Sequence, residues 1–245
     1  MRLWKNMLKT PNLKGIKPAE LGLKASRKSR LFAVFVRRVV QVRVMAPDSK
    51  KKYASLETLL RDVRACELCR DLPLGPRPVL RVNPEARLLI VGQAPGTKVH
   101  NTGIPWNDWS GDTLRGWMDV DRETFYDESR IAIIPVGLCY PGKAKMGDLP
   151  PRKECSETWL PHILPYLTNV RLTLLAGIYA QRVYLGARMK ENLTETVRAW
   201  REYMPEYVPT PHPSFHNLRW QQINPWFQEE VIPALRAAVK PLLKQ

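Results

Sequence analysis

One stretch constrains the fold of this chain more than any other. Residues 88–91 read Leu-Leu-Ile-Val, and Gly92 follows at once, before Gln-Ala-Pro-Gly at 93–96. Four consecutive apolar residues are typical of a strand that is buried on both faces of a parallel sheet. A strand that ends at glycine and turns through Pro-Gly brings bare backbone to the carboxyl edge of the sheet, where open α/β sheets bind ligands. The alternative interpretation is an ordinary strand-to-loop turn.

The rest of the chain alternates predicted strands with predicted helices. Apolar segments predict three further strands, at residues 131–134, 172–175 and 208–210. Apolar residues at three- and four-residue steps predict helices at 56–66, 110–118, 154–167, 179–185, 193–203 and 225–242, with Ser55 and Ser110 as N-caps and Pro233 as a candidate kink. This order predicts an α/β protein, a three-layer α/β/α sandwich around a central four-stranded, mainly parallel sheet. The polar loops after the first, second and fourth strands should meet on one face.

The chain is strongly basic, with a formal net charge of +16 at pH 7, but the charge is uneven. Residues 1–44 hold 12 Lys and Arg against one acid, which leaves +5 for the remainder. We expect residues 1–44 to be a disordered basic arm, although a transit peptide or a true start at Met45 would explain the same composition. Residues 45–245 then form a single, mildly basic domain, which suits a polyanionic partner such as DNA.

Composition also excludes some classes of protein. No apolar run approaches the roughly 18 to 20 residues of a membrane span, so we expect no membrane association. Four cysteines in 245 residues are too few for a disulfide scaffold and favour a reducing compartment. We therefore expect a cytoplasmic protein, and a monomer.

The cysteines have a spacing that indicates a bound metal. Cys66 and Cys69 form a Cys-x2-Cys pair, and Cys139 and Cys155 follow after gaps of 69 and 15 residues. Four thiolates complete a tetrahedral set for zinc or for an iron–sulfur cluster. The alternative is four unrelated buried cysteines, which the Cys-x2-Cys pair argues against. A zinc ribbon carries two such pairs and this chain has one, so the spacing leaves zinc and iron–sulfur open.

Two loops carry further candidate residues. In Pro105-Trp106-Asn107-Asp108, a nucleobase could stack on Trp106 while the Asp108 carboxylate faces its glycosidic carbon; the alternative is a core tryptophan and a helix-capping aspartate. The second loop begins with His212-Pro213-Ser214 and includes Asn217. There the imidazole could donate to an oxygen that becomes anionic, and Ser214 and Asn217 could bind a phosphate. His-Pro pairs are common in loops, so this second motif is weak by itself.

Together these motifs resemble a known family. The glycine turn at 92–96, Gly103-x-Pro105-Trp106, the cysteine spacing and His212-Pro213-Ser214 are similar to the uracil-DNA glycosylase superfamily, above all to its iron–sulfur branches in thermophiles and many bacteria. The resemblance covers residues 66–235. It implies an enzyme that flips uracil or a related deaminated base out of DNA and hydrolyses the N-glycosidic bond, which starts base-excision repair.

The resemblance also implies a role for each motif residue, and a cytoplasmic protein of bacterial type. The base would stack on Trp106, and His212 would stabilise the departing uracil anion. By role, the implied residues are Asp108 and His212 for catalysis, Gly92, Gln93, Ala94 and Trp106 for substrate binding, Pro213, Ser214 and Asn217 for DNA binding, and Cys66, Cys69, Cys139 and Cys155 for a 4Fe–4S cluster, with zinc as the alternative occupant.

The chain departs from the family pattern at two positions. Ala94 stands where cluster-free members carry Asp or Asn, so the carboxylate must come from elsewhere; Asp108 with Ser110-Gly111 is similar to a loop in the branch that lacks a carboxylate there. Pro135 stands where the cluster-bearing branches place a base-reading Asn, so the preferred base is not implied. Two other functions stay open: a non-catalytic DNA-damage-binding homologue with a structural metal site, and a zinc-stabilised nucleotide-binding protein.

Overall fold

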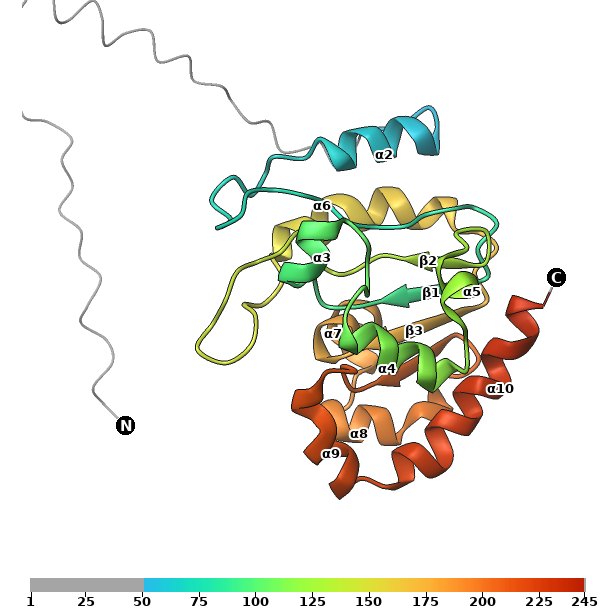
Figure 1. Cartoon of the computed structure of the whole chain (residues 1–245). Coiled ribbons are helices and arrows are strands. Elements are labelled where there is room, and N and C mark those ends of the chain that lie inside the picture. Colours follow the sequence, from blue (N-terminus) through green and yellow to red (C-terminus); the bar gives the residue numbers. More distant parts are fainter. Residues whose placement is uncertain (1–50, 245) are drawn as a thin grey trace, which may run out of the picture. The chain divides into compact units, whose positions relative to one another are not determined.

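A computed structural model describes residues 51–244, which pack around one four-stranded sheet (Figure 1). The strands are β1 (Leu88–Val91), β2 (Ile131–Ile133), β3 (Leu172–Ala176) and β4 (Tyr207–Thr210). Their order is β2-β1-β3-β4 and every pairing is parallel, so all four strands end at the same edge. The predicted strands and the α/β class are confirmed. The predicted basic arm at residues 1–44 lies outside the described residues.

The two middle strands are buried on both faces, as a run of apolar residues requires. Side chains alternate across a strand, so Leu88 and Ile90 pack into one hydrophobic core while Leu89 and Val91 pack into the other. All four of these side chains are 3 % exposed or less. The unbroken apolar pattern of β1 is therefore the signature of a strand with a helical layer on each side.

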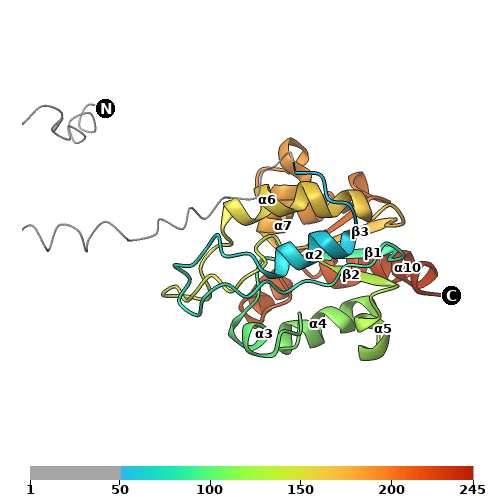
Figure 2. The ribbon, with the colours of Figure 1, turned by 90° about the horizontal axis from the view of Figure 1, so that it is seen from above.

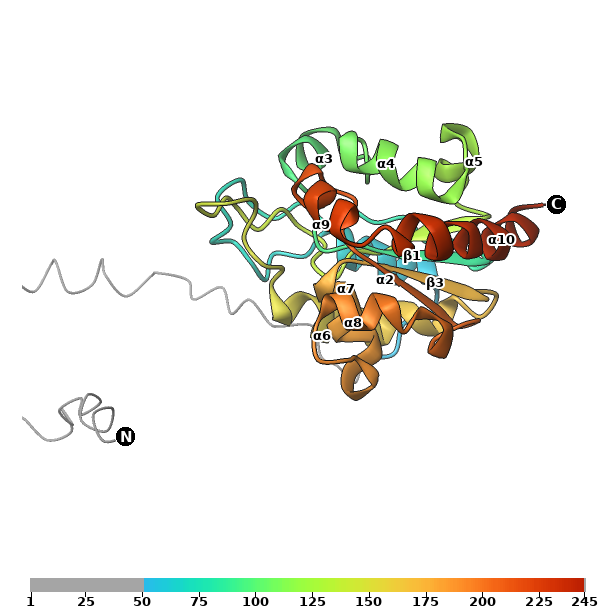
Figure 3. The same ribbon diagram turned by 90° about the horizontal axis from the view of Figure 1, so that it is seen from below.

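Helices cover both faces of the sheet, which gives the three layers that the sequence predicts. Helices α2, α6 and α7 lie over one face of the sheet and α4, α5 and α10 over the other (Figures 2 and 3). The side chains of each group enter the core on their own face. The helices of the described residues are α2 (Leu56–Arg64), α3 (Thr97–Thr102), α4 (Trp109–Met118), α5 (Arg122–Tyr126), α6 (Lys153–Ile163), α7 (Ile178–Leu185), α8 (Leu193–Arg198), α9 (Leu218–Ile223) and α10 (Ile232–Leu243).

Several predicted boundaries are wrong in detail. The predicted helix at 193–203 divides into α8 and a short 3₁₀ turn at Trp200–Glu202. The closing helix begins with one π-helical turn, Phe227–Val231, before α10. Pro233 is the second residue of α10 and directly follows the π-helical turn, so its missing N–H falls where the hydrogen-bond pattern of the closing helix changes. The short helices α3, α5 and α9 were not predicted, because segments of five or six residues show no clear apolar period.

Among residues 51–244, no helix is long and apolar enough to cross a membrane.

Candidate functional site

A large cavity opens at the edge where the four strands end. We call it the edge cavity; its volume is about 600 Å³, and residues that follow each of the four strands line it. This is the edge at which parallel α/β sheets bind ligands. The predicted site residues that line it are Gly92, Gln93, Ala94, Trp106, Asp108, His212, Ser214 and Asn217. Pro213 is not among them, and it is buried.

The glycine turn after β1 forms one wall of the edge cavity. A Cβ atom on Gly92 would lie 2.7 Å from a ring carbon of Trp106, so only glycine lets the indole pack against this strand end. Val136 N–H donates to the carbonyl of Gly92 at 3.0 Å, and Gly137 N–H donates to that of Gln93 at 2.9 Å. The turn is therefore held rigidly by the segment that follows β2.

Trp106 has an unusual backbone conformation. Its φ of 55° lies in the left-handed region, which bulky residues seldom adopt and which is often found at functional sites. The conformation turns the Trp106 carbonyl towards α4, where a Cβ atom on Gly111 would lie 1.8 Å from the carbonyl oxygen. Gly111 is thus required for the loop to approach the helix.

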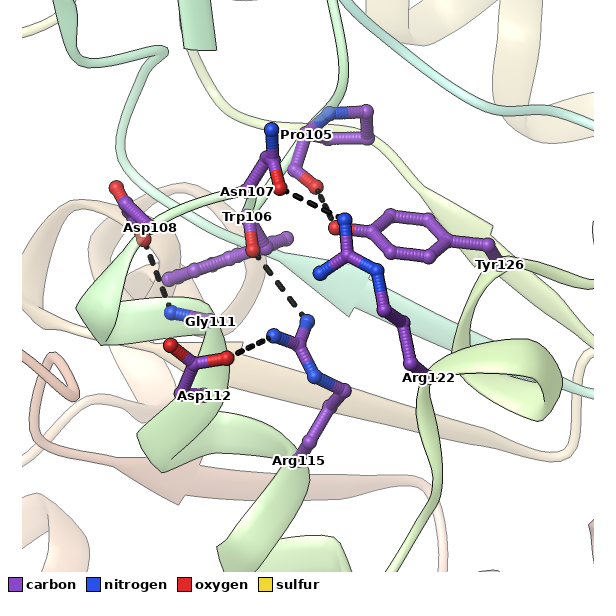
Figure 4. Close-up of polar contacts among 9 residues, drawn as sticks. All are labelled: Pro105, Trp106, Asn107, Asp108, Gly111, Asp112, Arg115, Arg122 and Tyr126. Atoms are coloured by element: carbon purple, nitrogen blue, oxygen red, sulfur yellow. Dashed lines mark hydrogen bonds and ion pairs between the residues drawn. The ribbon is translucent and has the colours of Figure 1, made fainter. Parts of the chain in front are cut away.

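Asp108 begins α4 as its N-cap. Its Oδ1 accepts a hydrogen bond from the backbone N–H of Gly111 at 2.9 Å, and the second carboxylate oxygen points away from that N–H (Figure 4). The prediction that Ser110 caps this helix is wrong, because an aspartate two residues earlier already supplies the capping oxygen. The capping alternative for Asp108 is thus observed, and it fixes the carboxylate at the wall of the edge cavity.

Three side chains hold the loop of residues 105–108 from behind (Figure 4). Arg115 donates to the Trp106 carbonyl at 3.4 Å and also pairs with Asp112. Arg122 donates to Asn107 Oδ1 at 2.8 Å, and the Tyr126 hydroxyl donates to the Pro105 carbonyl at 2.8 Å. The sequence does not single these residues out, because they look like ordinary polar residues on the exposed faces of two helices. These contacts explain how a strained loop keeps one conformation.

His212 lies in the wall of the edge cavity beside Trp106. The centroids of the two rings are 5.5 Å apart and their planes are tilted by 30°. Burial lowers the pKa of His212 to about 4, although the nearby carboxylates of Asp108 and Asp148 act in the opposite direction. The imidazole is therefore neutral at pH 7 and carries one N–H donor.

The loop after β4 is held by its own side chains. Asn217 Nδ2 donates to the His212 carbonyl at 2.8 Å, which uses part of the amide that we predicted to bind phosphate. At the end of β3, Gly177 has a φ of 94°, and a Cβ there would lie 3.2 Å from Cβ of His212. Beyond the loop, Phe215 is 61 % exposed and stands edge-on to Trp109, which is 48 % exposed, with ring centroids 6.5 Å apart. The cavity mouth thus has an exposed aromatic rim.

The four cysteines line a second, smaller cavity, which we call the cysteine cavity. The Leu138 N–H donates to Sγ of Cys155 at 3.3 Å, and the indole N–H of Trp159 donates to Sγ of Cys66 at 3.4 Å. Burial raises the pKa of the Cys139 thiol to about 11 and that of the Cys155 thiol to about 12. Without a nearby cation these sulfur atoms would hold their protons at pH 7.

The donor set of the cysteine cavity fits a metal group by its chemistry. Four soft sulfur ligands, two of them receiving N–H hydrogen bonds, are the environment of metal-bound thiolates. Within residues 51–244, no three Cys, His, Asp or Glu side chains are arranged to hold a metal ion. The four predicted ligands therefore line one cavity, but their sulfur atoms are not close enough together to coordinate one metal ion.

The comparison with known families agrees with this architecture. A family model described as the uracil DNA glycosylase superfamily matches residues 80–236, which is more than half of the chain. Cys66 and Cys69 precede the matched stretch, whereas Cys139 and Cys155 lie within it. Because that stretch contains all four strands and the loops that follow them to the edge cavity, we conclude that this chain belongs to the uracil DNA glycosylase superfamily.

Proposed function

We propose that this protein is a DNA glycosylase that removes uracil or a related deaminated base from DNA. The observation that carries the proposal is that Trp106, Asp108 and His212, from loops after two different strands, meet in the edge cavity of a superfamily member. The cavity is large enough for a nucleobase, and a flipped base could enter it from the strand-end side. As a repair enzyme it would work beside the chromosome, in bacteria the cytoplasm.

The reaction assigns a separate task to each polar residue. As the carbon–nitrogen bond breaks, the base takes the bonding electrons and the sugar gains oxocarbenium character; a water oxygen then bonds to the sugar carbon, and the departing base gains a proton. The neutral His212 N–H would donate to a base oxygen as negative charge develops there. The Asp108 oxygen that is not bonded to Gly111 would orient the water or balance the positive sugar.

The surface around the cavity suits DNA. The rings of Trp109 and Phe215 are exposed at its mouth, where unstacked bases could pack on them. The part of the chain after residue 44 carries +5, which favours association with a polyanion.

We further propose that the cysteine cavity holds a 4Fe–4S cluster through Cys66, Cys69, Cys139 and Cys155. In such a cluster each thiolate binds a different iron, so the four sulfur atoms lie further apart than around one zinc ion, for which Zn–S is about 2.3 Å. When bound, the cluster would serve to tie the segment after α2 to the loop after β2 and to α6. Zinc is the less favoured occupant.

Excision under single-turnover conditions tests the proposed function. The protein is mixed in excess with single- and double-stranded oligonucleotides that contain uracil, hypoxanthine or xanthine, and abasic sites are cleaved by alkali. We expect cleavage of at least one of these substrates and none of the matched undamaged strand. Activity on none of them, from protein that retains its metal, would contradict the proposal.

One observation favours a second candidate, a non-catalytic protein that binds damaged DNA. Pro135 lines the edge cavity and offers a base neither a side-chain donor nor an acceptor. Binding to uracil-containing DNA without excision, measured by fluorescence anisotropy on the same oligonucleotides, would support this candidate.

A further inference from the structure

A short hairpin overhangs the edge cavity between β2 and α6. Leu149 N–H donates to the Gly142 carbonyl at 2.8 Å, and Ala144 N–H donates to the Gly147 carbonyl at 3.1 Å. Lys143 and Asp148 face each other across the hairpin as an antiparallel bridge pair. Both residues line the edge cavity, and neither belongs to a motif that the sequence analysis singled out.

Asp148 and Lys143 form an ion pair in the cavity wall, with 3.2 Å between Lys143 Nζ and Asp148 Oδ1. Oδ1 is buried and, among the described residues, receives no well-aligned hydrogen bond. The Asp148 side chain as a whole is 29 % exposed, so the exposed part is not Oδ1. A Cβ on Gly96 would lie 3.6 Å from Oδ2, which places that oxygen beside the glycine turn. Oδ2 is thus the oxygen that a ligand could reach.

Asp148 also lies near the residue assigned to the departing base. Its negative charge raises the pKa of His212, against the larger effect of burial, as does that of Asp108. Two other polar side chains of the cavity already have partners: Asp108 Oδ1 caps α4, and Asn217 Nδ2 donates to the His212 carbonyl. The Lys143–Asp148 pair therefore offers what Pro135 does not, an acceptor next to a donor.

We propose that Asp148 and Lys143 read the edge of the flipped base, and that they select bases that carry a ring N–H beside a carbonyl. Asp148 Oδ2 accepts from the ring N–H, and Lys143 Nζ donates to the carbonyl oxygen. Deamination of cytosine or adenine creates this edge, because it replaces an amino group by a carbonyl and protonates the adjacent ring nitrogen; undamaged guanine and thymine already carry it. Uracil, hypoxanthine and xanthine share the edge. The inference rests on the proposed function, since it names the bases that the same cavity takes.

The same pair would reject undamaged cytosine and adenine. Their edges have the opposite order, an acceptor ring nitrogen beside an amino donor. Cytosine would place its ring-nitrogen lone pair against the carboxylate and its amino group against the ammonium. Asp148 should carry most of this discrimination, because its side chain is 29 % exposed whereas that of Lys143 is 70 % exposed and stays hydrated.

Binding by variants of the hairpin tests the inference. Oligonucleotide duplexes carry 2′-fluoro-deoxyuridine or 2′-fluoro-deoxycytidine at one mispaired position, so that the glycosidic bond resists cleavage, and affinity is measured by anisotropy. We expect wild-type protein to prefer uracil. Asp148→Ala should reduce the uracil-to-cytosine preference by about 10- to 100-fold, the effect of losing a hydrogen bond to a charged group, and Lys143→Ala should reduce it by less. Lys145→Ala, on the same hairpin but outside the cavity lining, should leave it unchanged.

The outcomes separate this inference from the proposed function. If wild-type protein excises uracil but both Asp148→Ala and Lys143→Ala keep the wild-type preference, the reading role is wrong while the glycosylase proposal stands. If wild-type protein prefers uracil in binding, the variants lose the preference and nothing is excised, the reading role stands and the glycosylase proposal fails. Equal thermal unfolding midpoints for the three variants exclude a loss of fold as the cause.

Discussion

The two cavities are held together in different ways. In the edge cavity, hydrogen bonds among its own loops fix the walls: Arg115 and Tyr126 hold the loop of residues 105–108, and Asn217 holds the loop after β4. In the cysteine cavity, the side chains that face each other come from segments as distant as Cys66 and Cys155, and their sulfur atoms receive two N–H hydrogen bonds.

This difference separates chemistry from stability. The edge cavity is preorganised by the protein alone, so removing a side chain from its wall should slow the reaction while the fold persists. The cysteine cavity brings together buried thiols that need a cation to ionise, so the cluster proposed to bind there would be part of the folded state. The predictions below test whether the two cavities are as independent as this comparison states.

The largest effect is expected from the cysteine cavity. Cys139→Ser should abolish metal binding and lower the thermal unfolding midpoint by on the order of 10 °C. The midpoint of a domain of this size falls by about 2–4 °C for each kcal/mol of unfolding free energy that is lost. The wild-type protein, purified without oxygen, should contain about four iron atoms per chain. Elemental analysis and circular dichroism measure both quantities. One zinc and no iron in wild-type protein would overturn the cluster assignment, and an unchanged midpoint in the variant would overturn the stability role.

The next effect concerns the departing base. His212→Ala should slow single-turnover excision by about 100- to 1,000-fold, the usual consequence of losing one donor to a developing oxyanion. His162→Ala is the matched control: this ring lies on α6 beside Tyr53, outside the lining of the edge cavity, so its loss should change the rate less than threefold. Full activity of His212→Ala would argue against excision in the edge cavity.

Asp108 allows the capping role and the catalytic role to be separated. Asparagine caps helices as well as aspartate, so Asp108→Asn should keep the stability of the protein while excision slows by about 100-fold or more. Asp108→Ala should in addition lose about 1 kcal/mol of unfolding free energy. The control is Ser55→Ala, which removes the N-cap of α2, a helix outside the lining of the edge cavity, and should cost stability alone. A wild-type rate for Asp108→Asn would leave the cap as the only role of this residue.

The last prediction concerns the pH dependence of stability that His212 causes. Its folded pKa of about 4 lies below the ordinary value of 6.5, so between these values the unfolded chain binds more protons. The stability contributed by the neutral ring is therefore present above pH 6.5 and is lost as the pH falls towards 4. Denaturant unfolding of wild-type and His212→Asn protein over this range measures the difference. An equal decline in both proteins would contradict the lowered pKa.

The sequence predicts the scaffold better than the site. An apolar run such as residues 88–91 has few possible structures, so all four strands could be placed, and the motif loops could be assigned to the edge where they meet. Side-chain contacts between distant segments leave no comparable pattern in the sequence. Arg115 looks like any arginine on a polar helix, yet its side chain is 8 % exposed and holds the Trp106 carbonyl. Similarly, Lys143 and Asp148 become neighbours only through a hairpin, and the residues between them do not predict it.

The cysteine cavity also sets an order of events during synthesis. Cys66 and Cys69 leave the ribosome first, with α2 just ahead of them, whereas Cys139 and Cys155 come only after two of the strands have been made. The apolar face of α2 packs in the same core as α6, the helix that carries Cys155. Until α6 has emerged, the apolar face of α2 therefore lacks that packing partner, and Cys66 and Cys69 are without the other two cysteines of the cavity. While residues 66–155 are being translated, the proposed cluster therefore cannot yet form, which leaves the Cys66 and Cys69 thiols accessible to oxidation.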